Sequence, residues 1–588
     1  MSLKDLISPF YAWKRVFEKP YTIKDPVNRE GAPTYRGFHT NDIEQCIGCG
    51  SCEEICQNES IDMVEVANIL AKPGDSGLRP LIDYGRCCWC ALCVDICPTK
   101  SLGMSNEFTW IDVDPEVYRF VPGVDKMPWE NEVEKGYKRG EEAWLISGVR
   151  EQMPEQEADE RKTTFDEFQD GFTDEQAIIE ANRCLDCGIC VEACPTHMDI
   201  PKYIKAIRDG ELDEGLRIMF QTNPMVEACG RICTAKCETV CAVGHEGKPI
   251  AIRWLKRYIG DKTFDRKDEI IGLKPKPASG KKVGIIGGGP AGLTAAYYLR
   301  TLGHDAVIYE MHDKLGGMLK YGIPDYRLPA NVLQREIDYI IRQDVEVKYN
   351  TKVGKDVMLD DIHKENDAVF VCIGAQLGTN MEIEGLHEDG VQSGVGFLEK
   401  IGKGERPDLG KDVVVVGGGN TAMDCCRSSV RLGSDVKILY RRTEKEMPAD
   451  DIEIIEAKEE GVDIQILTSP IKIQKKNGRL AIECIKMELG EPDKSGRRRP
   501  EPVKGSEYTI MADTCIMAVG QKVEPEIMKD LDIKLTRWGT FEVNTDTLKS
   551  NQAGVYAGGD CETGPDDAIR AIAAGKKAAY FIDKQFKG

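Results

Sequence analysis

The sequence has no apolar run of 18 residues, the length that predicts a membrane-spanning helix, and its first residues lack the apolar core of a signal peptide. It also lacks an excess of basic residues, since 78 Lys and Arg stand against 99 Asp and Glu, a net charge of −21. Nucleic-acid binding depends on cations that neutralise phosphates, so this balance argues against it. None of the 7 histidines falls in a motif, and we name no catalytic acid–base residue. These absences predict a globular cytoplasmic protein with no transmembrane segment.

Cysteine, by contrast, is abundant: 17 of the 23 cysteines precede residue 242. Without a secretion signal disulfides would be reduced, so the cysteines indicate metal or redox chemistry. The first two runs are Cys46-x-x-Cys49-x-x-Cys52-x-x-x-Cys56 and Cys87-x-x-Cys90-x-x-Cys93-x-x-x-Cys97-Pro98, the spacing of two-cluster bacterial ferredoxins. In that pattern the fourth cysteine of each run binds the other cluster. We expect one 4Fe–4S cluster on Cys46, Cys49, Cys52 and Cys97, and another on Cys87, Cys90, Cys93 and Cys56. Zinc is the alternative, although zinc sites use paired Cys-x-x-Cys knuckles.

Two further cysteine runs follow. The third is Cys184-x-x-Cys187-x-x-Cys190-x-x-x-Cys194-Pro195, and the fourth is Cys229-x-x-x-Cys233-x-x-x-Cys237-x-x-x-Cys241. The spacing of the fourth run is helical and would place the thiols on one face of a helix or of short helical turns. Core packing is the alternative for such a stripe. Because it accompanies a third cluster-type run, we favour cluster ligands.

A dinucleotide-binding fingerprint follows a Pro-, Lys- and Gly-rich linker. An apolar stretch leads into Gly287-Gly-Gly289-Pro290-Ala291-Gly292, then a helical stretch, then a second apolar stretch that ends at Glu310. In this pattern the glycines allow the tight turn, the approach of pyrophosphate and close packing of helix against strand. Phosphate would rest on the helix N-terminus, and Glu310 would accept hydrogen bonds from an adenosine ribose.

A second copy of the fingerprint begins at residue 412. It contains Gly417, Gly419, Asn420, Thr421 and Ala422, and its second strand ends in Arg441-Arg442 instead of an acid. Arginine there accommodates a 2′-phosphate, so the pair predicts NADP(H). The alternative is that both arginines are merely solvated. Arg497-Arg498-Arg499 is a further basic cluster, which we expect to be a solvated loop.

Two fingerprints, one with an acid and one with arginines, indicate one flavin and one nicotinamide nucleotide. The stretch Gly554-Val-Tyr-Ala-Gly-Gly559-Asp560 supports the flavin, since a strand that ends in Gly-Gly-Asp can set Asp560 against the ribityl chain. The Ala-rich helix that follows (568–579) would point its N-terminus at the flavin ring. The FAD domain is then discontinuous, interrupted by the NADP(H) domain.

Several short stretches occur in a fixed order from about residue 150 to the end of the second fingerprint. They are Phe165-Asp-Glu-Phe, Glu175-Gln-Ala, Arg183-Cys184-Leu-Asp-Cys187, Cys194-Pro195, Asn223-Pro224, Gly230-Arg231, Gly316-Gly317-Met-Leu, Gly322-Ile-Pro324, Arg327-Leu-Pro329, Tyr440-Arg441-Arg442 and Met447-Pro448-Ala449. On these stretches the chain resembles the glutamate synthase small-subunit family, which includes the large subunit of NADH-dependent reduced ferredoxin:NADP oxidoreductases. Residues 35–100, with Tyr35-Arg36-Gly37 followed by Cys46-Ile-Gly-Cys49, separately look like the ferredoxin-type subunit of complex I-related enzymes.

The resemblance implies two more 4Fe–4S clusters, and cofactor contacts at Gly317 and Arg327. One cluster would take Cys184, Cys187, Cys190 and Cys241. The other would take Cys194 and two later cysteines, completed in the family by a Glu or Gln. This chain has Lys256 at that position, and an ammonium has no lone pair for iron. We therefore expect Cys229 to substitute, giving the set Cys194, Cys229, Cys233 and Cys237, with an altered potential.

The expected fold is α/β, with two tandem Rossmann-like domains for FAD and NADPH after a helical iron–sulfur domain and a ferredoxin-like α+β domain. The expected ranges are 1–105 for the ferredoxin-like domain with an N-terminal docking segment, 106–164 for a connector, 165–272 for the helical domain, 280–405 with 506–588 for FAD, and 406–505 for NADP(H). Residues 1–20 mix apolar and basic positions at helical spacing. We expect them to contact a partner subunit, with a membrane-surface helix or an ordinary packed terminus as alternatives.

The resemblance implies a redox subunit of a larger complex, which moves electrons between NADP(H) and ferredoxin through FAD and four 4Fe–4S clusters. Electron bifurcation in a transhydrogenase-type complex is a further hypothesis. A glutamate synthase small subunit is an alternative, which the extra ferredoxin module disfavours. An adapter that wires other subunits, with vestigial nucleotide sites, is a third; the intact fingerprints argue against it.

Overall fold

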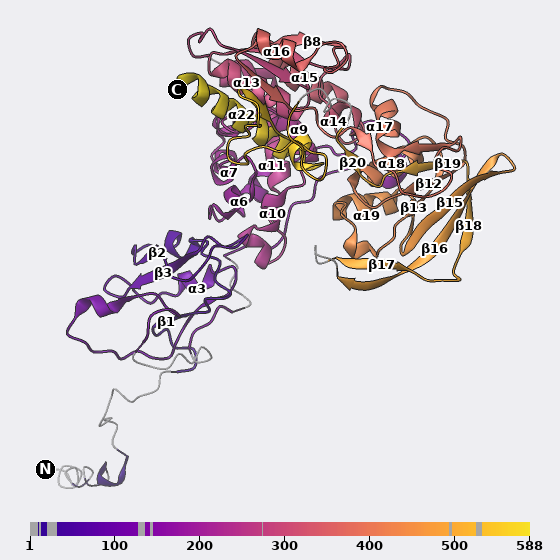
Figure 1. Cartoon of the computed structure of the whole chain (residues 1–588). Coiled ribbons are helices and arrows are strands. Elements are labelled where there is room, and N and C mark those ends of the chain that lie inside the picture. The colour runs from indigo at the N-terminus through magenta and orange to yellow at the C-terminus, as the bar shows by residue number, and fades with distance from the viewer. Residues whose placement is uncertain are drawn as a thin grey trace. The chain divides into compact units, whose positions relative to one another are not determined.

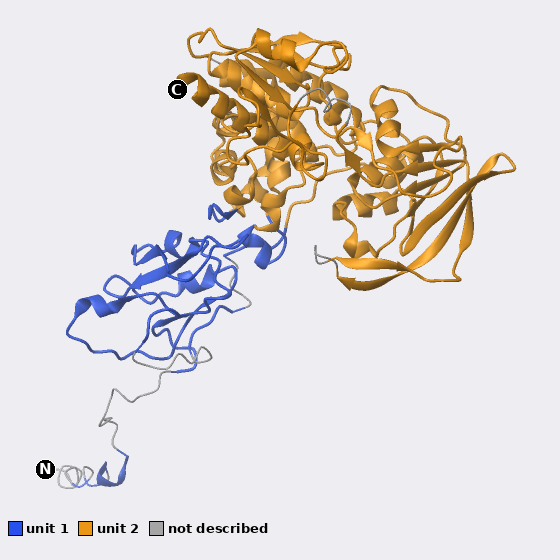
Figure 2. Cartoon of the chain, in the orientation of Figure 1, with its two compact units in different colours: residues 1–149, 185–189, 241–249 blue, residues 150–184, 190–240, 250–588 orange. Residues whose placement is uncertain are grey.

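The computed structural model describes residues 10, 13, 15–19, 32–127, 136–140, 145–272, 275–492, 497–524 and 532–588 (Figure 1). The chain divides into two compact units (Figure 2). Unit 1 comprises residues 1–149, 185–189 and 241–249, and unit 2 comprises residues 150–184, 190–240 and 250–588. Most of residues 1–20 lie outside the described part, so their docking role stays a prediction.

Unit 1 has the ferredoxin-like arrangement expected for the first two cysteine runs. Strands β1 (His39–Asn41) and β4 (Leu102–Met104) pair antiparallel, and β2 (Ile61–Glu65), β3 (Leu78–Asp83) and β5 (Arg119–Phe120) form a second antiparallel sheet. The short helices α2 (Ser51–Glu54) and α3 (Leu92–Asp95) follow the left-handed residues Gly50 and Ala91. Strand β5 lies within residues 106–164, which we predicted to be a connector. Because β5 completes a sheet, the first part of that range belongs to the ferredoxin-like fold.

Helices dominate the part of the chain between the cysteine runs and the first nucleotide fold. They are α4 (Ala158–Arg161), α5 (Asp174–Asn182), α6 (Ile189–Ala193), α7 (Ile200–Arg208), α8 (Leu212–Phe220), α9 (Val226–Ile232), α10 (Lys236–Thr239), α11 (Ile252–Thr263) and α12 (Lys267–Ile271). Local sequence sets their starts: Thr173 and Gln176 form a capping box at α5. The fourth cysteine run lies on short helical turns, not on one helix, because α9 ends before Cys233 and α10 starts afresh.

The first nucleotide fold in unit 2 is a five-stranded parallel sheet in the order β21-β9-β6-β7-β8. Its strands are β6 (Lys282–Ile286), β7 (Asp305–Tyr309), β8 (Glu346–Lys348), β9 (Ala368–Val371) and β21 (Val555–Ala557); its helices are α13 (Pro290–Thr301), α14 (Met318–Tyr321), α15 (Ala330–Ile341), α16 (Leu359–Glu365), α21 (Asp560–Thr563) and α22 (Ala568–Lys587). Strand β21 comes from the end of the chain, in keeping with the expected discontinuity of this domain.

The second nucleotide fold is a parallel sheet in the order β11-β19-β12-β13-β14. It contains β11 (Val391–Ser393), β12 (Asp412–Val416), β13 (Asp435–Leu439), β14 (Asp463–Gln465) and β19 (Thr514–Met517), with α17 (Gly394–Gly402), α18 (Asn420–Arg431) and α19 (Asp451–Glu459). Since β11 and β19 belong to this sheet, the predicted limits 406 and 505 are too narrow. These two strands are short and carry no motif, so only their pairing identifies them.

An antiparallel sheet extends the second fold. It consists of β15 (Thr468–Lys476), β16 (Arg479–Pro492), β17 (Arg498–Pro502) and β18 (Tyr508–Ala512), all paired through β16. Arg498 and Arg499 therefore lie in a strand, which corrects the expectation of a loop. Strands β10 (Leu377–Gly378) and β20 (Gln521–Lys522) form a separate antiparallel pair.

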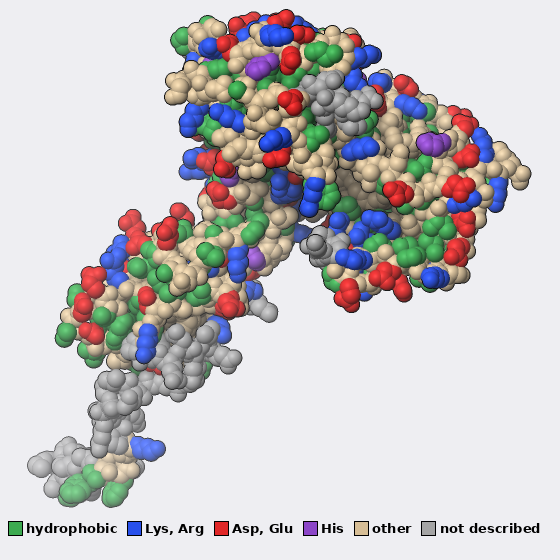
Figure 3. Space-filling model, viewed as in Figure 1, with side chains coloured by type: hydrophobic (Ala, Val, Ile, Leu, Met, Phe, Trp, Pro, Cys, Tyr) green, Lys and Arg blue, Asp and Glu red, His purple; other side chains and the backbone are tan. Residues whose placement is uncertain are grey.

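The expected α/β class with two parallel sheets is confirmed. Acidic and basic side chains are interspersed over the visible face (Figure 3). Across the described residues, no helix is both long enough and apolar enough to traverse a bilayer.

Candidate functional site

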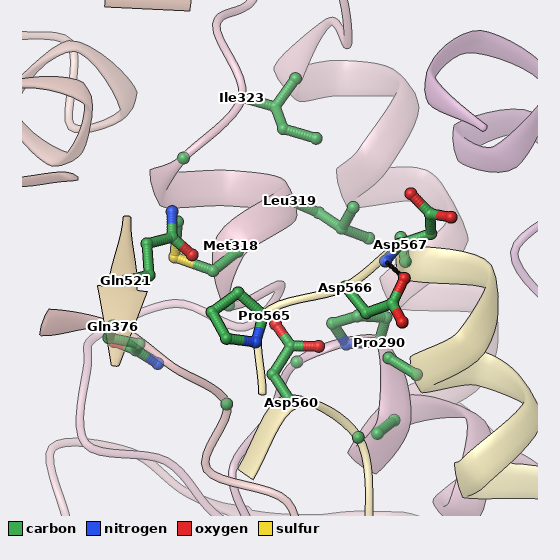
Figure 4. A pocket seen from close by; sticks show the side chains of 18 of the residues that line it. Pro290, Met318, Leu319, Ile323, Gln376, Gln521, Asp560, Pro565, Asp566 and Asp567 are labelled. Carbon is green, nitrogen blue, oxygen red and sulfur yellow. Dashed lines mark hydrogen bonds between the residues drawn. The ribbon is translucent and has the colours of Figure 1, made fainter. Parts of the chain in front are cut away.

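The main cavity of unit 2 measures about 380 Å³ and lies where the two nucleotide folds meet. It is lined by the first fingerprint (Gly287, Gly289, Pro290, Ala291), by Glu310, Gly317, Arg327, Gly559 and Asp560, and by Asn420 and Thr421 of the second fingerprint. In Figure 4, Gln376 and Gln521 lie on one side and Asp566 and Asp567 on the other, with Pro565 between them and Asp560 below. The cavity is thus lined both by residues predicted to bind FAD and by residues predicted to bind NADP(H).

Glycine shapes the wall of this cavity by close approach. A Cβ atom at Gly292 would lie 2.0 Å from the carbonyl oxygen of Gly287, so α13 can pack against the β6 turn only without a side chain there. Gly317 has φ +51°, and a Cβ atom on it would lie 2.9 Å from the Cα of Gly289. Two backbone segments therefore approach closely beside the N-terminus of α13, where a pyrophosphate would rest.

Glu310 lies at the end of β7 and is buried. One carboxylate oxygen accepts from the N–H of Gly288 at 2.8 Å, and the other accepts from the N–H of His312 at 2.9 Å. Burial raises the pKa of Glu310, and these backbone donors oppose that rise. The acid is thus held rigidly at the cavity wall, the position expected for a ribose contact.

Of the second fingerprint, only Asn420 and Thr421, the first two residues of α18, line the cavity. Gly417 and Gly419 form the turn after β12, Ala422 is buried inside α18, and the Asn420 side-chain oxygen accepts from the N–H of Asp450 at 2.9 Å. Thr421 lies 3.5 Å from the amide nitrogen of Gln521. Asn420 and Thr421 therefore line the cavity from the predicted NADP(H) fold, beside Gln521 of the β10–β20 pair.

The two arginines of the predicted 2′-phosphate site differ in their surroundings. Arg441 is exposed, whereas Arg442 is buried and donates from Nε to the carbonyl oxygen of Arg498 at 2.8 Å. Arg442 thus anchors strand β17, and Arg441 is the better placed of the two to meet a phosphate. Arg498, which we expected in a solvated loop, is brought beside this pair.

Arg327 lines the cavity, but its guanidinium is held by acids. It donates to both carboxylate oxygens of Asp424 at 2.9 and 2.8 Å and pairs with Glu453 at 2.7 Å. Since Asp424 and Glu453 belong to α18 and α19, Arg327 links the first nucleotide fold to the second.

Asp560 starts α21 at the carboxyl end of β21, as the Gly-Gly-Asp pattern suggested. Burial raises the pKa of Asp560 to about 7. The nearby Asp566 and Asp567 also line the cavity, and Lys236 of α10 pairs with Asp567 at 2.8 Å. A helix of the cysteine-rich region therefore contacts the cavity rim.

The cysteines of the first two runs separate into the two sets expected from their spacing. One small cavity in unit 1 is lined by Cys46, Cys49, Cys52 and Cys97, and another by Cys56, Cys87, Cys90 and Cys93 together with Cys88, which lies outside the repeating spacing. No three His, Cys, Asp or Glu side chains among the described residues converge on a single-metal position. Each set instead surrounds a space, an arrangement that fits a multi-iron cluster.

Polar groups accompany these sulfur atoms. Serine hydroxyls lie 3.3 Å from the sulfur of Cys49, 3.0 Å from that of Cys56 and 3.4 Å from that of Cys97. His39, which no motif identified, lies with Nε2 3.2 Å from the sulfur of Cys93 and Nδ1 2.7 Å from the hydroxyl of Tyr84. Burial lowers the pKa of His39 to about 3, so the ring is neutral. Such groups tune cluster potentials.

The third and fourth runs are distributed over both units: Cys187 and Cys241 belong to unit 1, Cys184 and Cys190 to unit 2. Cys194, Cys229, Cys233 and Cys237 all lie in unit 2 around Lys256, which is 6% exposed. Burial raises the pKa of Cys229 to about 12, against the attraction of Lys256. Burial alone would lower the pKa of Lys256, but the negative charge of the four cysteines raises it. The set expected for the fourth cluster is thus brought together.

Several residues of the main cavity carry no sequence signal. Gln376 directly precedes β10, Gln521 is the first residue of β20, and Ile232 and Thr234 come from the cysteine-rich region. The sequence pattern could not identify them, because their role depends on which segments meet in space.

Three family profiles match this chain in order. Residues 45–101 match a 4Fe-4S dicluster domain, residues 161–268 match dihydropyrimidine dehydrogenase domain II with its 4Fe-4S cluster, and residues 281–575 match the pyridine nucleotide-disulphide oxidoreductases.

Three curated proteins illustrate its relatives. The NADPH-Fe(3+) oxidoreductase subunit beta of Geobacter sulfurreducens is 39% identical over 67% of this chain and 63% of its own length. The NADP(+)-dependent formate dehydrogenase subunit beta of Moorella thermoacetica is 40% identical over 68% and 60%. The glutamate synthase [NADPH] small chain of Escherichia coli is 38% identical over 71% and 93%. This chain therefore spans less than two thirds of the first two relatives and nearly all of the third.

Proposed function

Since this chain belongs to the pyridine nucleotide-disulphide oxidoreductase family and is a relative of the glutamate synthase small chains, we propose that it passes electrons from NADPH through FAD to four 4Fe–4S clusters. This membership and the two iron–sulfur matches support the class expected from the sequence, an NADPH-dependent FAD and iron–sulfur oxidoreductase. The cluster number, the ligand sets and the individual cofactor contacts belong to the proposal.

The observation that carries the proposal is the shared cavity. One space of about 380 Å³ is lined by Gly287 and Asp560 of the first nucleotide fold and by Asn420 and Thr421 of the second. A bound flavin accepts hydride from a nicotinamide and releases electrons singly to clusters. A cavity lined by both fingerprints can hold the two reacting rings against each other, which is the positioning that this chemistry needs.

The protein's own groups have separate tasks in this scheme. With FAD bound, Glu310 would hold the adenosine ribose, the backbone at Gly289 and Gly317 would admit the pyrophosphate, and Asp560 would face the ribityl chain; all four residues line the cavity. The ion pairs of Arg327 hold the two nucleotide folds in register. No side chain is required to move a proton in hydride transfer.

The contacts within unit 1 support an order for its two clusters. Cys187 interacts electrostatically with both Cys49 and Cys241, and Arg139 joins the carbonyl oxygen of Cys97 to the carboxylate of Glu246, each at 3.0 Å. The set with Cys49 and Cys97 is therefore next to the segment 241–249. The other set contains the exposed Cys90, and we propose it as the exit for electrons.

For the acceptor we propose ferredoxin or another redox subunit of a hetero-oligomeric complex, with bifurcation as a further possibility for the flavin. A glutamate synthase small subunit is the second candidate, favoured by the 93% coverage of the Escherichia coli small chain. The two differ in their partner and in their need for the ferredoxin module.

The test is anaerobic reconstitution of the full chain with iron, sulfide and FAD. We expect about sixteen irons and one FAD per chain, bleaching of the flavin by NADPH and NADPH-driven viologen reduction. Ferredoxin reduction that is lost in Cys90→Ala while flavin bleaching persists would support the proposed exit. No viologen reduction by cofactor-replete protein would refute the proposal, and glutamine-dependent activity with a co-purified partner would favour the second candidate.

A further inference from the structure

Helices α9 and α11 pack against each other at unusually short range. A Cβ atom at Gly230 of α9 would lie 2.7 Å from the Cα of Arg257 on α11, and one at Gly260 would lie 3.0 Å from Cγ of Glu227. Cys229 and Lys256 are the chain neighbours of Gly230 and Arg257. The close packing therefore brings the backbone of Lys256 to the helix that carries Cys229.

Three other basic residues of this helix pair are buried. Arg253 of α11 donates to the carbonyl oxygen of Cys233 at 3.1 Å, whereas Arg231 and Arg257 pair with acids. Arg231 pairs with Glu167 at 2.8 Å and Asp261 at 2.9 Å, and Arg257 pairs with the same two acids at 3.1 and 3.2 Å. Within the described part of the chain, no carboxylate forms an ion pair with Lys256. The charges with the largest effect on it are those of Cys233, Cys229, Cys237 and Cys194.

A buried ammonium without a carboxylate is costly unless another negative group compensates it. An iron–sulfur cluster bound by four thiolates is negatively charged and gains one more negative charge when it is reduced. A fixed cation beside it, shielded from water, stabilises the reduced form more than the oxidised form, because attraction is strong at low dielectric constant. Charge next to a cluster is one of the ways in which a protein sets its potential.

We propose that the Lys256 ammonium raises the reduction potential of the cluster held by Cys194, Cys229, Cys233 and Cys237, so that this cluster draws electrons from the flavin. The inference rests on the proposed function for the presence of that cluster. It goes further because it assigns a role to Lys256. The family resemblance implies a Glu or Gln ligand to iron at this position, whereas Lys256 would supply a positive charge that favours reduction of the cluster.

The experiment is an anaerobic redox titration of the reconstituted full chain, followed by electron paramagnetic resonance. The signal of this cluster is identified by its loss in Cys233→Ala. In Lys256→Met and Lys256→Gln we expect the equilibrium constant for one-electron reduction of this cluster to fall at least tenfold. This corresponds to a shift of its reduction potential by about 59 mV in the negative direction. Lys256→Arg keeps the charge and should stay within threefold of the wild type.

Lys236→Met provides the matched control. Lys236 also adjoins a cysteine of this set, Cys237, but its side chain is 44% exposed and pairs with Asp567. Screening by water should reduce its influence, so we expect less than half of the shift seen for Lys256→Met.

The outcomes separate the inference from the function on which it rests. An iron-replete Lys256→Met or Lys256→Gln protein with unchanged potential overturns the inference. Loss of this cluster in both neutral variants, with retention in Lys256→Arg, also overturns it, because Lys256 is then needed for assembly and not for tuning. A wild-type chain that binds FAD but lacks iron at these cysteines is instead a failure of the proposed function.

Discussion

Glu310 offers a quantitative test of the flavin site. Its buried carboxylate accepts from two backbone N–H groups, those of Gly288 and His312. In Glu310→Ala both donors lose their acceptor, at about 1–3 kcal/mol each, so the free energy of unfolding of the apoprotein should fall by about 2–6 kcal/mol. The lost bond to the ribose, worth about 1.5–3 kcal/mol for a charged acceptor, should raise the Kd for FAD a further ~10- to 150-fold.

In Glu310→Gln the free energy of unfolding should fall by about half as much as in Glu310→Ala, because the single amide oxygen can accept from only one of the two N–H donors. Urea unfolding of the apoprotein gives the first quantity, and quenching of flavin fluorescence on rebinding gives the second. Glu365→Ala on α16 is the matched control, since its side chain is 62% exposed in the same fold. A Glu310→Ala protein with wild-type stability and wild-type FAD affinity would refute the assignment.

Three further predictions concern the nucleotide folds. Arg441→Ala should raise KM for NADPH ~10-fold or more while KM for NADH stays unchanged, through loss of a charge-assisted phosphate contact; equal losses with both nucleotides in dye-reduction assays would contradict it. Gly292→Ala places a Cβ atom 2.0 Å from the Gly287 oxygen, so stability should fall by about 1–3 kcal/mol and purified protein should lack FAD; a flavin-replete variant would be the contrary result. Asp560, with a folded pKa of about 7 against an ordinary 3.8, contributes stability below pH 4 that is lost as the pH rises to 7. Asp560→Asn should therefore stabilise the apoprotein by up to ~4 kcal/mol at pH 8 and by less at pH 5, as measured by thermal unfolding; equal effects at both pH values would contradict this.

The ferredoxin-like part was the most predictable from sequence. The spacing Cys46-x-x-Cys49-x-x-Cys52 fixes a tight loop, and the exchange of Cys56 and Cys97 between the two cavities follows from the length of one helical turn. The fingerprint glycines could also be predicted from the sequence. At a position such as Gly292, the backbone of Gly287 lies too close for any residue with a side chain.

Other assignments depended on partners distant in sequence. Arg442 follows Arg441 directly, yet Arg442 is buried against a carbonyl of strand β17 while Arg441 is exposed. The limits of the second fold were misjudged because β11 and β19 are short and are recognised only by their pairing, of β19 with β12 and of β11 with β19. His39 gave no signal, since its contact with Cys93 spans 54 residues.

The amino-acid order alone predicted how the cysteines group, where two glycine-rich turns occur and which family the chain resembles. These features rest on short covalent spacings and on close backbone contacts that local geometry enforces. The fold in three dimensions decided that both fingerprints line one cavity and that Lys256, with no carboxylate beside it in the described structure, lies among four cysteines. Burial and charge arise where separate helices and strands pack together, and no local pattern encodes which of them will meet.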